Sequence, residues 1–273
     1  MLGVWDLSCR TEFHTRYAGK PSNTGRLDMR TLSKIKLFGL LAGISICAFA
    51  AQPAAALSFT FFTPAGSTCG GEACAAEAVI TTGGGSISVT LTDLLTPAQV
   101  RSAGQALSDL QFTLSNAPGT QGTLSASGQL ANIGAGGTVT NVSGTPVRWI
   151  GQGPPPPGGS GTFTVSGNTI LMEAIGGGQP SQMILPSGGS FTNANAFITG
   201  GQFNPFVIGP ASFTLSFAGV TAGTTVTAAT FSFGTGPDSF IPGVPVPGPI
   251  VGAGLPGLMA ACVGLLALAR HRG

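Results

Sequence analysis

The sequence predicts an all-β fold, an antiparallel β-sandwich with a jelly-roll-like arrangement, inside a chain of 273 residues. Apolar and polar residues alternate along many short segments, which is the period-2 pattern of half-buried strands. Clusters of Gly, Pro and Asn interrupt these segments, and the chain contains 44 Gly and 20 Pro. Short strands separated by such frequent turn signals are typical of a sandwich or barrel.

Residues 29–56, before the predicted sandwich, have the features of a secretory signal peptide. A short basic stretch contains Arg30, Lys34 and Lys36. The apolar run 37–50 follows, and it is too short to cross a bilayer of about 30 Å as a helix. Ala54 and Ala56 then provide the small residues of a cleavage site, so Leu57 is the expected first residue of the exported chain.

Residues 1–28 have no place in such a signal peptide. Two interpretations stay open at this point. Met29 is the true start of the protein, or residues 1–28 form a charged leader that is removed together with the signal.

The exported body is expected to comprise residues 57–236. Its clearest alternating segments predict strands at 87–91, 112–114, 163–165, 213–217 and 226–233. Phe residues supply most of the predicted core. One stretch, 97–107, favours one or two helical turns, because Thr96 is a suitable N-cap and Pro97 suits the first helical position. Pro154 to Pro157 predict a stiff, exposed hairpin tip.

Cys69 and Cys74 are the only cysteines between residues 57 and 236. In the oxidising environment outside the cytoplasm, this pair is expected to form a small local disulfide.

The body lacks the residue types that most catalytic sites require. Residues 57–236 contain no His, Lys or Tyr, which excludes Ser-His-Asp and Cys-His catalysis and the common zinc sites. We therefore predict neither an enzyme nor a bound cofactor or metal. A glycosidase needs only two carboxylates, so a hydrolase would require two acids to converge in one cleft. The candidate acids for such a pair are Asp93, Asp109, Glu173 and Asp238.

Charge also excludes one class of partner. Between Leu57 and Phe240 the only cations are Arg101 and Arg148, against six carboxylates. A protein surface without a basic stripe is poorly suited to nucleic acid, so no nucleic-acid partner is predicted.

Trp149 is the lone Trp of the body and the leading candidate for a ligand contact. An aromatic ring can stack on a sugar, so this residue could mark a glycan site. The competing interpretation, a core or rim aromatic, is favoured because large aromatic side chains are usually buried.

The C-terminal end predicts a membrane anchor. Residues 237–249 form a Pro-rich linker, residues 250–269 an uncharged stretch long enough to span a bilayer, and residues 270–273 a basic tail. Arg270 and Arg272 are expected to stay on the cytoplasmic side, which leaves the body outside.

The order of Pro-rich motif, hydrophobic helix and basic tail resembles the PEP-CTERM sorting signal of bacterial proteins that an exosortase processes. The resemblance covers about the last 30 residues, where Val246, Pro247, Gly248 and Pro249 begin the motif of a variant signal. The Glu of Pro-Glu-Pro is absent, and Val246 or Gly248 stands in its place. The resemblance implies contact with the membrane, with an exosortase-like processing enzyme and with extracellular polysaccharide.

Together these features predict an exported, non-enzymatic protein of the cell envelope or surface, anchored in the membrane at least transiently or released after processing. Its expected role is association with extracellular polysaccharide or adhesion. The alternative is an extracellular β-sandwich module that binds a ligand or glycan.

Overall fold

The computed structural model describes residues 56–149, 162–175, 179–236 and 239–246. All of them belong to one compact unit, Ala54–Gly273, whereas a second unit, Met1–Pro53, lies outside the described residues. The signal segment up to residue 55, the proline run 154–157 and the predicted anchor and tail, 250–273, also lie outside them. Most of the described residues form β-strands, which confirms the all-β prediction.

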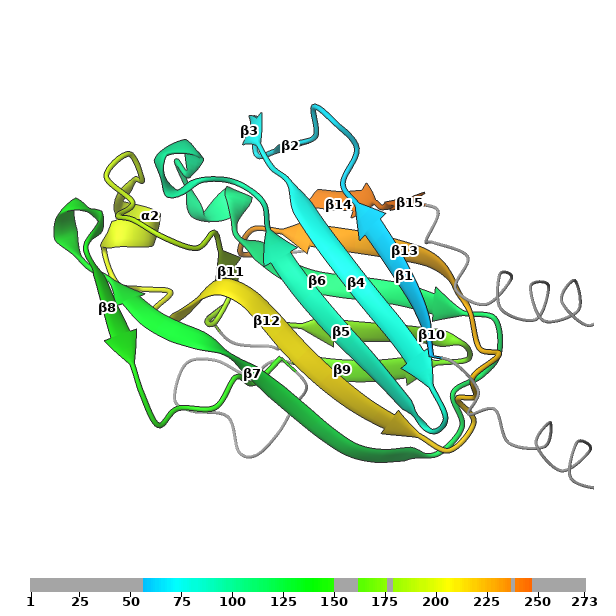
Figure 1. The fold of residues 1–273 in the computed structure, drawn as a ribbon. Helices are drawn as coiled ribbons and strands as arrows, with labels where there is room; N and C mark the ends of the chain where they lie inside the picture. Colours follow the sequence, from blue (N-terminus) through cyan, green and yellow to red (C-terminus); the bar gives the residue numbers. More distant parts are fainter. Residues whose placement is uncertain (1–55, 150–161, 176–178, 237–238, 247–273) are drawn as a thin grey trace, which may run out of the picture. The chain divides into compact units, whose positions relative to one another are not determined.

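The sheet has two layers, and the layer nearer the viewer in Figure 1 is the larger one. Its strands are hydrogen-bonded in the order β15-β1-β4-β5-β12-β7-β8, and all neighbours are antiparallel. The strands are β1 (Leu57–Phe62), β4 (Ala76–Gly83), β5 (Ser86–Asp93), β7 (Gln121–Ile133), β8 (Val139–Val142), β12 (Phe206–Phe217) and β15 (Val244–Val246).

The second layer lies behind the first in Figure 1 and follows the order β14-β13-β6-β10-β9. Its neighbouring strands are antiparallel as well. The strands are β6 (Leu107–Leu114), β9 (Thr162–Ser166), β10 (Thr169–Glu173), β13 (Val226–Phe233) and β14 (Ser239–Pro242).

A short strand, β11 (Ile184–Leu185), joins the two layers into one mixed sheet. It pairs antiparallel with β6 but parallel with β12. The prediction of a purely antiparallel arrangement is therefore wrong at this strand. A parallel pair needs a crossover connection, and residues 186–205 with helix α2 (Ala196–Thr199) provide one.

The segment Ser239–Val246 provides a second link between the layers. Its first part, β14, pairs with β13, and its second part, β15, pairs with β1. The sheet therefore continues past residue 236, where the Pro-rich composition predicts a linker. Pro245 is tolerated because β15 is an edge strand, in which a missing backbone N–H breaks no ladder on the open side.

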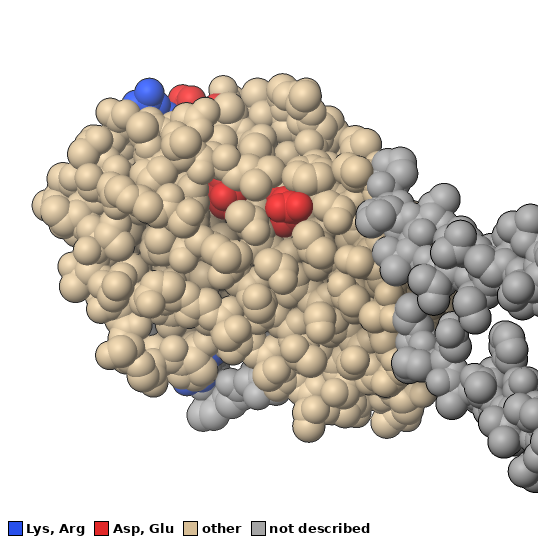
Figure 2. Space-filling view, viewed as in Figure 1, with Lys and Arg blue, Asp and Glu red and all other residues tan. Residues whose placement is uncertain are grey.

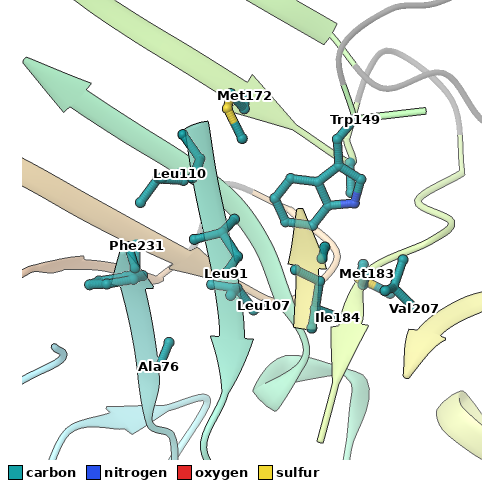
Figure 3. Close-up of a cluster of buried hydrophobic side chains, with 14 of the residues drawn as sticks. Ala76, Leu91, Leu107, Leu110, Trp149, Met172, Met183, Ile184, Val207 and Phe231 are labelled. Atoms are coloured by element: carbon teal, nitrogen blue, oxygen red, sulfur yellow. The ribbon is translucent and has the colours of Figure 1, made fainter. Parts of the chain in front are cut away.

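Strict alternation puts apolar side chains between the layers. In β4, every second residue from Ala76 to Thr82 is buried, and in β5 the residues from Ile87 to Asp93 alternate likewise. Phe163 of β9 stacks on Phe217 of β12, with ring centroids 6.2 Å apart. Figure 3 shows part of this core, including Leu91, Leu107, Leu110, Met172, Ile184 and Phe231.

Helical structure is confined to short connections. The stretch that predicts helical turns forms two 3-10 turns, η1 (Pro97–Gln99) and η2 (Ala103–Gln105). Thr96 precedes the first turn as expected, and its backbone N–H donates to Gln99 Oε1 at 2.8 Å. Another 3-10 turn, η3 (Ala135–Gly137), follows β7. Within the described ranges, no helix has the length and apolar composition needed to cross a membrane.

Candidate functional site

The two ends of the described fold lie on neighbouring strands. Leu57, the expected first residue after cleavage, begins β1, and Val246, the first residue of the expected sorting motif, ends β15. The two strands are antiparallel, with Thr60 opposite Val246 and Phe62 opposite Val244. Leu57 and Val246 therefore lie toward the same end of the sheet. Ala56 is exposed next to it.

Other predicted processing residues fall outside the described residues. These are Ala54 of the cleavage site and Pro247, Gly248, Pro249, Arg270 and Arg272 of the sorting signal.

Gly243 lies at the turn between β14 and β15 and lets the chain pass from one layer to the other. Its backbone N–H donates to Ala229 O at 2.8 Å. A Cβ at this position would lie 3.1 Å from Phe231 Cε2 and 3.2 Å from Phe61 Cβ, which come from opposite layers. The absence of a side chain therefore permits close packing at this edge of the sheet.

Cys69 and Cys74 form a disulfide with an S–S distance of 2.09 Å, and both side chains are buried. Cys69 ends β2 (Thr68–Cys69) and Cys74 directly follows β3 (Glu72–Ala73), so the disulfide joins the two strands of a small hairpin. Gln105 Nε2 donates to Ala73 O at 2.7 Å and so ties the hairpin to η2. The hairpin follows the C-terminal end of β1, so it lies at the opposite end of the sheet from Leu57.

Trp149 is fully buried, with 0% of its surface exposed. Its indole N–H donates to Gln182 O at 2.7 Å, and its ring lies 5.6 Å from the Phe213 ring, centroid to centroid. Figure 3 shows it inside the buried cluster with Met172 and Ile184. The ring has no exposed face on which a sugar could stack, so its place in the structure is that of a core aromatic.

Asp109 and Glu173 are brought together by strand register. They lie directly opposite each other on β6 and β10, while Ser232 lies opposite Asp109 on its other side. Opposite residues of an antiparallel pair have Cβ atoms about 5 Å apart. Two of the four candidate acids, the number that a hydrolase would need, are therefore neighbours in this structure. Asp93 lies on a different strand, β5, and Asp238 lies outside the described residues.

The Asp109 carboxyl is shielded from solvent, with only 4% of the residue exposed. Burial and the nearby charge of Glu173 raise its pKa to about 7, despite a hydrogen bond from Ser108 Oγ to Oδ2 at 3.1 Å. With this pKa the carboxyl is protonated below neutral pH and ionises as the pH rises through about 7. Its low exposure gives a large substrate no direct access.

Asp93 ends β5 and has a structural role in the following turn. The Leu95 backbone N–H donates to its Oδ1 at 2.9 Å, while Oδ2 has no hydrogen-bond partner among the described residues. Burial raises the pKa of Asp93 to about 8. The sequence alone does not distinguish Asp93 from an exposed acid. The one available signal is alternation, because Asp93 continues the buried series Ile87, Val89 and Leu91 of β5.

The described residues contain no group of three or more His, Cys, Asp or Glu side chains that could hold a metal ion. The face shown in Figure 2 is almost entirely uncharged, with a few small acidic and basic areas. Comparison with known proteins found no match among protein-family models, curated proteins or solved structures.

Proposed function

We propose that this chain is an exported, non-enzymatic protein of the bacterial cell envelope or surface. A signal peptide directs it out of the cytoplasm, and a PEP-CTERM-like signal delivers it to the membrane, where an exosortase-like enzyme is its processing partner. The β-sheet body is the working part, and it associates with extracellular polysaccharide or takes part in adhesion.

One observation carries the proposal. The sheet begins at Leu57, directly after the expected signal cleavage site, and its last described strand ends at Val246, where the expected sorting motif begins. The folded body thus fits between the two segments that the sequence marks for processing. The buried Cys69–Cys74 disulfide adds support, because such bonds persist outside the cytoplasm.

The finer architecture belongs to the same proposal. We infer that the two layers form a jelly-roll-like sandwich whose core is closed at one side by β11 and at the other by the segment Ser239–Val246. The strand pairings of β11 and of Ser239–Val246, which connect the two layers, support this inference.

The alternative function is an extracellular module that binds a small ligand or glycan. Trp149 does not serve as its contact, because the ring is enclosed in the core. A hydrolase built on Asp109 and Glu173 is the less favoured possibility, since Asp109 is shielded from solvent.

Fractionation of a bacterial culture that expresses the chain tests the proposal. The full chain is expected in the envelope, and a variant that lacks residues 250–273 is expected in the periplasm or medium with the same stability. A matched variant with Ala54→Lys and Ala56→Lys should keep an uncleaved signal segment. Recovery of the unaltered full chain in the cytoplasm with its N-terminal segment intact would overturn the proposal.

A further inference from the structure

The outer face of the larger layer presents an ordered field of hydroxyl groups. On three adjacent strands, every outward position of the central region is Ser or Thr, and these side chains are exposed or half-buried. The residues, called here the hydroxyl field, are Ser86, Ser88 and Thr90 of β5, Ser212, Thr214 and Ser216 of β12, and Thr123, Ser125 and Ser127 of β7.

Strand register aligns these residues in rows. One row runs across five strands, in the order Ser58, Thr81, Ser88, Thr214 and Ser125. A second row contains Thr90, Ser212 and Ser127. The third contains Ser86, Ser216 and Thr123, the last two joined by a hydrogen bond of 3.1 Å between their hydroxyls. Neighbouring residues in a row lie on adjacent strands, whose backbones are about 4.8 Å apart. Successive rows are two residues apart along each strand, which corresponds to about 6.7 Å.

The field contains no charged or aromatic side chain. Glu77 and Phe62 lie on the same face, but in a row closer to the disulfide end, and Val79 interrupts the row of Thr90 on one side. Figure 2 views this face and shows two small acidic areas and no basic area over its central strands. An anionic polymer therefore finds no basic side chain to bind over these strands.

The composition also differs from that of protein interfaces. Hot spots in those interfaces are enriched in Trp, Tyr and Arg, whereas Ser and Thr are under-represented. Each Ser or Thr hydroxyl can both donate and accept a hydrogen bond. A matching partner would carry hydroxyl groups of its own, which also donate and accept hydrogen bonds. Because the hydroxyls of the protein lie in regular rows, we expect those of the partner to repeat along its length.

The twist of the sheet further limits the kind of ligand that can follow these rows. Adjacent strands rotate by roughly 20 to 25° relative to one another, so a row that crosses several strands follows a curved path. A rigid planar lattice cannot stay in contact with such a surface, whereas a polymer chain can bend along it.

We propose that the hydroxyl field binds an uncharged polysaccharide, with its chain laid across the strands along the hydroxyl rows. This inference rests on the proposed function, because it requires the body to lie outside the cytoplasm. Each contact is a neutral hydrogen bond, direct or through water, and affinity comes from many such contacts along one chain.

Native gel electrophoresis in gels that contain dextran, galactomannan or hydroxyethylcellulose tests this proposal, with alginate as the charged counterpart. The purified, oxidised chain should be retarded by at least one uncharged polymer and not by alginate. The triple variant Ser88→Ala, Thr214→Val, Ser125→Ala removes three hydroxyls of the longest row without changing side-chain size much. We expect its apparent dissociation constant to rise at least about tenfold.

Two control variants separate loss of hydroxyls from loss of fold. Ser88→Thr, Thr214→Ser, Ser125→Thr keeps the hydroxyls and should retain binding. Thr164→Val, Ser166→Ala, Thr230→Val makes the same type of change on the outer face of the other layer and should bind like the unaltered chain. Absence of retardation in all three uncharged gels, or equal loss in both hydroxyl-removing variants, overturns the proposal.

Export of the chain is measured separately by fractionation. An exported chain without affinity for these polymers would contradict the inference about the hydroxyl field but would agree with the proposed localisation. A chain retained in the cytoplasm would sink the proposed function.

Discussion

At the scale of single residues, burial changes the chemistry of two carboxyl groups. Asp93 and Asp109 lie on different strands, yet each is almost fully enclosed. Desolvation disfavours the ionised form, and it is the largest cause of the raised pKa of both groups. Both groups therefore link the stability of the fold to pH.

Asp93→Asn is expected to reduce the pH dependence of stability. Burial raises the pKa of Asp93 from 3.8 to about 8, so from about pH 4 to pH 8 the unfolded chain has released a proton that the folded protein retains. The free energy of unfolding of the unaltered protein should therefore fall as pH rises through this range. Each pKa unit corresponds to about 1.4 kcal/mol, so the total loss should reach several kcal/mol.

Urea unfolding at pH 4 and pH 8 measures this effect. The Asn variant keeps an acceptor for the Leu95 N–H and should match the unaltered protein at pH 4, but exceed its stability at pH 8. Part of the pH dependence should remain, because Asp109 has a pKa of about 7. Equal slopes for both proteins would contradict the burial of a protonated Asp93.

Trp149→Ala should destabilise the fold by about 3–5 kcal/mol, because it removes a large buried ring and leaves Gln182 O without its donor. Phe240→Ala is the matched control, since that ring is 59% exposed, and its effect should be much smaller. Chemical denaturation measures both variants. A similar small effect for both would show that Trp149 is not part of the core.

These residues also show what sequence reasoning can reach. Alternation along β5 identifies Ile87, Val89 and Leu91 as core residues, because a strand turns every second side chain to the same face. It does not reveal that Asp109 faces Glu173, since that contact depends on the pairing of strands far apart in the chain. The enclosed position of Trp149 depends on contacts with residues 182 and 213 for the same reason.

At the scale of elements, the segment Ser239–Val246 shows how composition can mislead. Its prolines and Gly243 suit a linker, yet the segment pairs with β13 and β1 and connects both layers. The sequence contains the local signals of a turn. It does not show that β13 and β1 each have a free edge with which this segment pairs. The same holds for β11, whose parallel pairing depends on a crossover of about twenty residues.

Gly243→Ala is predicted to destabilise the fold by about 1–3 kcal/mol, because the new methyl group would crowd Phe231, Ala229 and Phe61. Gly84→Ala is the control, since a Cβ there meets nothing within 4 Å. Thermal unfolding should show a clear decrease for the first variant and little change for the second. Unchanged stability of the Gly243 variant would mean that this segment does not close the two layers tightly.

At the scale of the whole molecule, the described body has two distinct ends. One end holds Leu57 and Val246 on neighbouring strands, and the opposite end holds the disulfide hairpin next to η2. A chain processed at both expected sites would keep all described strands, because β1 starts after the first site and β15 ends where the motif begins. Processing at these sites would thus remove none of the described strands.

The most direct test of this account is the intact mass and N-terminal sequence of the protein recovered from envelope and medium fractions. We predict a chain that starts at Leu57, extends at least to Val246 and is lighter by two hydrogens than its reduced form. A chain that starts at Met1 or Met29, remains in the cytoplasm and has both cysteines reduced would contradict the account.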